Sequence, residues 1–303
     1  MAKYQTIDIQ QEITDYFIKN LENVTDGWEM PFFGGGGATN VVTKKTYRGI
    51  NQIVLSFKAY ERGYKTDYWA TANQFFALGG GERDGKKVLT PSKYHVRKGE
   101  KATRVILWKT FEKENAETGE TETFPVSRAY PVFNADQIEG YQPPVVEVAD
   151  NTVKHAYADE FLAALNITTE HSSKGRAFYV PSKDFVHMPN RENFRATKTS
   201  TATDAYYSTL AHEYVHATMH KSRLDRDAKD YAKEELVAEI GAAMVMGYLG
   251  LNNTVRDDHI KYVKSWLKHL KDDKKFIVQA ASKAQKALDW MVEQQADELA
   301  QAA

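Results

Sequence analysis

The stretch HEYVHATMHK, His212–Lys221, decides the fold of the second half of this chain. It places three of the chain's nine histidines, His212, His216 and His220, at intervals of four residues. On a helix, side chains at positions i and i+4 lie one above the other on the same face. HEYVH matches H-E-x-x-H, so we expect His212 and His216 to direct their ring nitrogens at one metal ion.

The residue that follows each histidine distinguishes the two possible pairs. Glu213 is offset from His212 by about a quarter turn, so its carboxylate can reach a water molecule at the ion and act as the general base. His216 is followed by Ala217, so the pair His216–His220 has no adjacent base. Because MHKSRLDR is expected to end the helix, we expect His220 to lie near the site without binding the ion.

A third ligand is expected from the downstream stretch YAKEELVAEIGAAM, because catalytic zinc sites commonly have three protein ligands. Glu235 and Glu239 are four residues apart and share a face with the small residues Ala242 and Ala243, which would let the two helices approach closely. We expect Glu235 to be the ligand and Glu239 to orient a ligating histidine, with the reverse assignment open. Glu234 is expected to face solvent. Zinc is the expected ion, although such ligands also accept other divalent metals.

The composition is that of a folded protein with about two domains. The chain has 303 residues, of which 42% are hydrophobic. Cysteine is absent, which excludes disulfides, thiolate ligands and a cysteine nucleophile. No apolar run approaches the ~18 residues of a membrane span, and MAKYQTIDIQQEITDYF lacks the pattern of a secretory signal. We therefore expect a cytoplasmic protein without a membrane partner.

The net charge of −1 conceals a basic block between Asn40 and Thr110. Fifteen lysines and arginines face five acids there, a net of +10, so the rest carries about −11. Such a block indicates a polyanionic partner, most often nucleic acid. Aromatic residues are interleaved with the charges, as in proteins that hold single-stranded nucleic acid by phosphate contacts and base stacking. The candidate DNA contacts are Lys44, Lys45, Tyr47, Arg48, Trp69, Arg97, Lys98, Lys101 and Arg104.

Within this block, Trp69 and Trp108 lie in apolar runs, so a place in the core is the alternative to base stacking. Tyr68 and Tyr94 are two further aromatic residues of the block. The sequence contains no motif for reading a specific DNA sequence. We therefore expect weak sequence preference and strong salt dependence.

Hydrophobic periodicity predicts an α+β fold. Helices are expected over residues 7–22, over a segment ending near Gly63, and along DYWATANQFFALGGG until the glycines Gly79–Gly81 end it. ATRVILWKTFEK and RAYPVFNADQIEG are rich in β-branched and aromatic residues and predict two strands joined by a polar tip. The Pro-Pro pair of YQPPVVEVAD marks the best linker candidate. We therefore expect an α+β DNA-binding domain over residues 1–145.

Residues 146–303 are expected to form a helix-rich domain with a small sheet. Its central helices are expected from Tyr206 to about His220 and from about Tyr231 to Leu249, followed by two amphipathic helices. FVHMP, from Phe185, is expected to be an edge strand that can pair with an extended peptide.

The sequence resembles the ArdC-type antirestriction proteins. The resemblance covers nearly the whole chain through TKKTYRGIN, YWATANQFFALGG, YHVRKGEKATRVILWK, VFNADQIEG, AFYVPSKDFVHMP, YYSTLAHEYVHATMHKSRLDR and YAKEELVAEIGAA. It implies a single-stranded-DNA-binding domain joined to a zincin-like metallopeptidase domain, with His212, His216 and a glutamate of EELVAE as ligands and Glu213 as base. The spacing of the two glutamates in ELVAE, compared with zincins that use a glutamate ligand, favours Glu235.

Three hypotheses follow. In the first, the protein coats incoming single-stranded DNA of a mobile element, and its peptidase half cuts or captures a host defence protein. In the second, DNA coverage alone blocks the nuclease, and the metal domain is structural. In the third, the protein is a metalloprotease of DNA-bound proteins.

Overall fold

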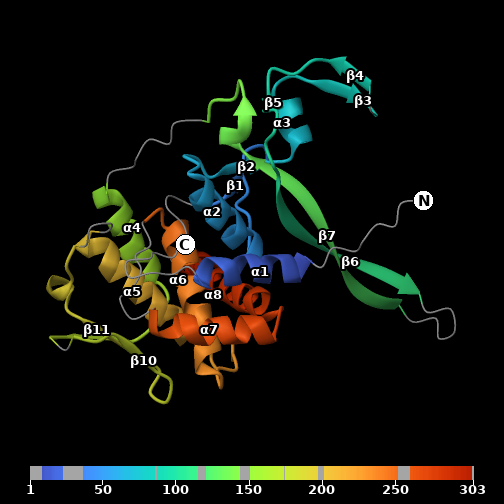
Figure 1. The fold of residues 1–303 in the computed structure, drawn as a ribbon. Helices are drawn as coiled ribbons and strands as arrows, with labels where there is room; N and C mark the ends of the chain where they lie inside the picture. Colours follow the sequence, from blue (N-terminus) through green and yellow to red (C-terminus); the bar gives the residue numbers. More distant parts are fainter. Residues whose placement is uncertain are drawn as a thin grey trace. The chain divides into compact units, whose positions relative to one another are not determined.

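A computed structural model describes residues 9–22, 37–85, 87–114, 121–143, 151–173, 175–196, 201–251 and 260–301. The chain forms two compact units, and Figure 1 labels most of their helices and strands. The first unit is built mainly from Ala38–Tyr47 and Phe57–Pro144. The second contains α1 (Ile9–Glu22), Arg48–Ser56 and the chain from Val145 onward. The proposed linker, residues 141–150, lies largely outside the described residues, and a boundary near residue 145 remains a prediction.

A four-stranded sheet in the order β1-β2-β7-β6 organises the first unit. Its strands are β1 (Thr39–Asn40), β2 (Tyr68–Ala70), β6 (Thr103–Glu114) and β7 (Thr121–Asn134). β1 and β2 are parallel, whereas β7 pairs antiparallel with both β2 and β6. The hairpin β6–β7 runs in register from Thr103 opposite Val132 to Glu114 opposite Thr121, which confirms the two predicted strands. The predicted polar tip lies outside the described residues.

Short elements complete this unit. They are the last turns of α2 (Ile50–Arg62), whose first residues up to Ser56 belong to the second unit, and α3 (Ala72–Leu78), β3 (Glu82–Asp84), β4 (Lys87–Thr90), β5 (His95–Val96), a 3-10 turn (Ala135–Gln137) and β8 (Ile138–Glu139). The helix predicted within DYWATANQFFALGGG is wrong in its first part, because β2 precedes α3. Thr71 separates the two elements, since its side chain accepts from the backbone N–H of Gln74 and so begins α3 as a capping box.

The second unit joins a three-stranded sheet to a group of helices. The sheet has the order β10-β11-β9, with β9 (Thr169–Ser172), β10 (Phe178–Val180) and β11 (Phe185–Pro189). β11 pairs parallel with β9 and antiparallel with β10. The expectation that FVHMP is an edge strand is therefore wrong, because β11 lies between its two neighbours. β10 and β9 form the edges of the described sheet.

The helices of this unit include the two predicted central helices and the two amphipathic helices after them, although the first central helix begins at Ala202 rather than Tyr206. They are α4 (Asn151–Ala163), α5 (Ala202–Ala217), α6 (Tyr231–Tyr248), α7 (Ile260–Asp272) and α8 (Phe276–Gln301). α5 begins with a capping box between Thr201 and Asp204, and Asp230 accepts from the backbone N–H of Lys233 at the start of α6. Both helices are buried along most of their length, which fixes their side chains firmly against each other.

Within the described ranges, each helix lacks either the length or the apolar content that a membrane span requires.

Candidate metal centre

His212, His216 and Glu235 meet in the interior of the second unit. Each offers one ligand atom, and these atoms all lie within 4.8 Å of one another. The Nε2 atoms of His212 and His216 are 3.1 Å apart. One carboxylate oxygen of Glu235 lies 3.6 Å from His212 Nε2, and the other lies 3.5 Å from His216 Nε2. All three residues are buried.

The two histidine nitrogens and the two Glu235 oxygens lie at separations close to those between the ligands of a tetrahedral metal ion. Ligand atoms at about 2.0–2.1 Å from a tetrahedral zinc lie about 3.3 Å from one another. The Nε2 atoms of the two histidines are 3.1 Å apart, and the two Glu235 oxygens lie 3.6 and 3.5 Å from His212 Nε2 and His216 Nε2, values on either side of that distance. Two imidazoles and a carboxylate are also the donor types that zinc and similar divalent ions bind. The three residues therefore fit the ion that the sequence predicts.

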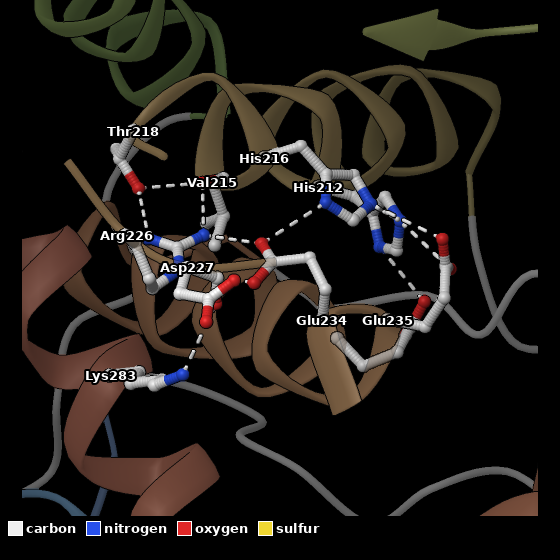
Figure 2. A network of polar contacts seen from close by, with 10 residues as sticks. His212, Val215, His216, Thr218, Arg226, Asp227, Glu234, Glu235 and Lys283 are labelled. Atoms are coloured by element: carbon white, nitrogen blue, oxygen red, sulfur yellow. Dashed lines mark hydrogen bonds and ion pairs between the residues drawn. The ribbon is translucent and has the colours of Figure 1, made fainter. Parts of the chain in front are cut away.

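A second set of contacts holds the outer nitrogens of the two histidines. His212 Nδ1 lies 2.8 Å from a carboxylate oxygen of Glu239, and His216 Nδ1 lies 3.3 Å from one of Glu234. Figure 2 shows Glu234 and Glu235 extending from α6 toward the histidines of α5. The expectation that Glu234 faces solvent is wrong, because it is only 4% exposed. Glu234 lies on the first turn of α6, next to Glu235, and its side chain reaches His216 of α5.

The charges of this cluster favour a cation. Burial raises the pKa of the Glu235 carboxyl, but contacts with His212 and His216 outweigh burial and hold that pKa well below its usual value. Burial acts likewise on Glu234, where His216 and Arg226 lower the pKa. Burial also lowers the pKa of His216, but its neighbours Glu234 and Glu235 raise it overall. The interior thus holds ionised carboxylates that positive charge stabilises.

Glu213 and His220 occupy different surroundings. Glu213 is 3% exposed, and its charge reaches His216, where it favours the imidazolium. His220 lies beyond the end of α5 at Ala217. Its Nδ1 lies 2.7 Å from the hydroxyl of Ser222 and 3.5 Å from a carboxylate oxygen of Asp184. The helix therefore ends before His220, which does not join the group formed by Glu235 and the two histidines.

The candidate DNA contacts are exposed cations of the first unit, Arg48 of the second unit, and aromatic residues. Most of the cationic side chains are exposed in the first unit: Lys44, Lys45, Arg97, Lys98, Lys101 and Arg104. Arg97 forms an ion pair with Glu100 at 2.9 Å. Arg48 belongs to the second unit and forms an ion pair with Asp289 of α8. The phosphate contacts remain predictions.

The burial of the aromatic candidates changes the expectation that bases stack on them. Trp69 is 0% exposed and packs edge-on against Tyr64, so no base can stack on it while this core stays folded. Tyr47 is half-buried and accepts a hydrogen bond from Asn40 at 3.2 Å. The side chain of Trp108 lies outside what the structure describes. The apolar run around Trp69 thus forms core, as the alternative reading of the sequence allowed.

A group of half-buried tyrosines lies over the core of the first unit. Tyr68, Tyr94 and Tyr141 pack against a buried cluster that includes Phe75. The rings of Tyr94 and Tyr141 meet edge to face, with centroids 5.2 Å apart. The ammonium of Lys44 lies 5.6 Å from the centre of the Tyr68 ring. Sequence reasoning missed Tyr141, because it lies within the presumed linker, outside the basic block.

The H-E-x-x-H helix, the glutamate supplied by the next helix and the small adjoining sheet define a zincin-like metallopeptidase domain. Residues 156–283 match the family of zincin-like metallopeptidases. Residues 7–135 match the N-terminal domain of the anti-restriction factor ArdC. The chain belongs to the ArdC family of antirestriction proteins, and the predicted fold class and resemblance are confirmed.

Two crystal structures are similar over almost the whole chain. The metal-free antirestriction ArdC protein of plasmid R388 is 38% identical, with a TM-score of 0.74 over 96% of this chain and 99% of that one. The Mn(II)-bound structure is 39% identical, with a TM-score of 0.68 over 95% and 98% of the two chains.

Two curated relatives extend the comparison. The uncharacterized protein y4eC of Sinorhizobium fredii is 35% identical over 307 residues, covering 96% of this chain and 93% of that protein. A DNA primase TraC of Escherichia coli is 33% identical over 310 residues, but these cover 93% of this chain and only 27% of the primase. This chain thus corresponds to a portion of the larger primase.

Proposed function

We propose that this protein binds single-stranded DNA through its first unit and hydrolyses peptide bonds at the metal centre of its second, protecting incoming mobile-element DNA from host restriction. The observation that carries the proposal is the buried triangle of His212, His216 and Glu235 in a chain of the ArdC family. The exposed cations of the first unit support the DNA-binding half. A host defence protein is the proposed peptidase substrate.

The residues of the centre have separate roles in this proposal. His212, His216 and Glu235 hold a divalent ion, with zinc expected; the related R388 protein was solved with Mn(II). A bound divalent ion polarises a carbonyl and makes water more acidic. Glu213 accepts the proton at its carboxylate and returns it to the departing amine, as a general base and then a general acid. Glu239 keeps His212 oriented through Nδ1.

DNA binding rests on charge and on the tyrosine group. Lys44, Lys98 and Lys101 are exposed and offer phosphate contacts with weak sequence preference. Because Trp69 is enclosed in the core, base stacking falls to the half-exposed Tyr68 and Tyr94. The arrangement of Tyr68 beside Lys44 supports this assignment, since it combines an aromatic ring with a positive charge.

A transfer experiment tests the function of the two halves together. Restriction-proficient cells receive conjugated DNA while expressing wild type, Glu213→Gln, or the double variant Tyr68→Leu/Tyr94→Leu. Tyr157→Leu is the matched control, because Tyr157 is a 45% exposed tyrosine of the second unit. We expect both test variants to lose protection while the control retains it.

The transfer experiment, a degradation assay and a DNA-retardation assay together distinguish the alternatives. If Glu213→Gln binds metal and protects fully, catalysis is not the mechanism, and the protein is a DNA shield with a structural metal domain. If wild type gives no protection but degrades proteins bound to single-stranded DNA, it is a protease of DNA-bound proteins. Normal DNA retardation by the double tyrosine variant at low salt would refute the stacking assignment.

A further inference from the structure

A buried arginine lies directly behind the metal centre. Arg226 belongs to the segment between α5 and α6, and its side chain is only 5% exposed. Its Nε donates to a carboxylate oxygen of Glu234 at 3.1 Å, and one terminal nitrogen forms an ion pair with the other oxygen. The guanidinium thus contacts both oxygens of one buried carboxylate, the bidentate geometry that makes an arginine–carboxylate ion pair strong (Figure 2).

The other contacts of Arg226 tie this pair to the end of α5. One terminal nitrogen donates to the hydroxyl of Thr218 at 2.7 Å, and the other donates to the backbone carbonyl of Val215 at 3.1 Å. Thr218 itself donates to the same carbonyl at 2.6 Å. These residues flank His216, so the guanidinium fixes Glu234 relative to the helix turn that carries the histidine.

Glu234 in turn controls which nitrogen of His216 faces the ion. An Nδ1 that faces a carboxylate carries the proton, which leaves the lone pair on Nε2. That Nε2 points at His212 Nε2 and at Glu235. If the ring turned over or its proton moved to Nε2, the lone pair would be lost from the centre. A rotation of Glu234 would remove this constraint, and it would also break the contacts of Arg226 with both oxygens of Glu234.

We propose that Arg226 and Glu234 form a positioning pair that fixes the ring orientation and tautomer of His216, and so strengthens metal binding. The inference rests on the proposed metal site and adds two residues that do not touch the ion. A positioning role is distinct from a general role in folding: it requires that removal of either residue lowers metal affinity more than the loss of melting temperature alone accounts for.

The chain supplies a matched control in Arg223. Its side chain is 9% exposed, and it pairs with Asp184 through contacts of 2.6 and 3.1 Å. It also donates to the carbonyl of Ala217 at 3.0 Å, at the same end of α5. Arg223 therefore resembles Arg226 in burial, ion pairing and capping, but its ion pair does not involve a glutamate that holds His216.

The test compares full-length wild type with Arg226→Met, Glu234→Gln, Glu234→Ala and Arg223→Met. Zinc affinity is measured by competition with a chromophoric chelator, and the melting temperature is measured without metal. We expect Arg226→Met and Glu234→Ala to weaken affinity by about 10–100-fold, while Arg223→Met stays close to wild type despite a similar loss in melting temperature. Glu234→Gln keeps an acceptor oxygen for Nδ1–H, so its loss is smaller than that of Glu234→Ala.

A spectrum of the histidine rings provides a second measurement. Long-range nitrogen–proton correlations report the tautomer of His216, which is expected to be Nδ1-protonated in wild type and mixed in Glu234→Ala. Equal losses of affinity in Arg226→Met and Arg223→Met, with an unchanged tautomer in Glu234→Ala, would overturn the inference. A wild type that takes up no zinc would instead refute the metal site itself. If Arg226→Met does not fold, the two Glu234 variants decide the question.

Discussion

Gly241 sets the distance between the two helices of the metal centre. It lies on α6, and a Cβ built at this position would come within 2.7 Å of both methyl carbons of Val215 on α5. Non-bonded carbons normally stay about 3.5–4.0 Å apart. Gly241→Ala therefore requires a displacement of about 1 Å between the helices. Val215 is 0% exposed, so its side chain has little room to yield.

The expected cost follows from two opposing effects. Overpacking a buried contact costs about 1–3 kcal/mol, whereas exchange of glycine for alanine within a helix gains about 1 kcal/mol. We expect Gly241→Ala to lower the free energy of unfolding by up to about 2 kcal/mol. We expect the metal affinity to fall by more than the stability does, because Glu235 and Glu239 move with α6 and the distance from a ligand to its metal varies by only about 0.2 Å.

The assay is a double-mutant cycle with Val215→Ala, which removes both methyl groups that clash. We expect the double variant to regain part of the stability and metal affinity lost in Gly241→Ala, with a favourable coupling energy of about 0.5–3 kcal/mol. Gly175→Ala is the control, because a Cβ there meets no described atom within 4 Å. If Gly241→Ala raises the free energy of unfolding, as a glycine-to-alanine exchange in an unhindered helix does, and binds zinc as tightly as wild type, the reasoning is refuted.

Three further outcomes are expected. Glu235→Ala should lose bound zinc in metal analysis, and retention of full metal content would contradict its role as ligand. His220→Ala should keep the full metal content, since the ring of His220 contacts Ser222 rather than the centre. Burial raises the pKa of Asp67 to about 6, whereas the unfolded chain has about 3.9. Between these two pKa values only the folded state keeps the Asp67 carboxyl protonated, so the free energy of unfolding falls as pH rises from about 4 to about 6. Asp67→Asn removes this loss, so thermal melts should show a free energy of unfolding about 2–3 kcal/mol above wild type at pH 7.5 and little difference at pH 4.

The sequence predicted the parts of the centre that depend on local periodicity. The i, i+4 spacing of His212 and His216 determines that they share a helix face, and the structure shows that this face is buried. Glu235 followed from the same rule applied to the next helix. The approach of the two helices was attributed to Ala242 and Ala243, but the tight contact is at Gly241, one residue earlier.

The missed features depend on short or non-local contacts. β1 has two residues and β9 has four, too few for a recognisable alternation. Trp69 lies on the three-residue strand β2, which the helical pattern of the residues after it obscured. The pairing of Arg226 with Glu234 depends on how the segment between α5 and α6 folds back, and no periodic rule describes such a segment. All of α1 except Ile9 belongs to the second unit, although two segments of the first unit, Ala38–Tyr47 and Phe57–Pro144, follow it in the chain.

The three glutamates of α6 have different roles because two histidines have four ring nitrogens. The two Nε2 atoms converge on one centre, and each Nδ1 lies beside a different carboxylate, that of Glu239 for His212 and that of Glu234 for His216. Only Glu235 has both oxygens directed at the Nε2 atoms. For Glu239 to become the ligand, the His212 ring would have to turn its Nδ1 into the centre. His212 Nε2 would then lose its place opposite His216 Nε2, so the orientation of the rings favours Glu235 over Glu239 as the ligand.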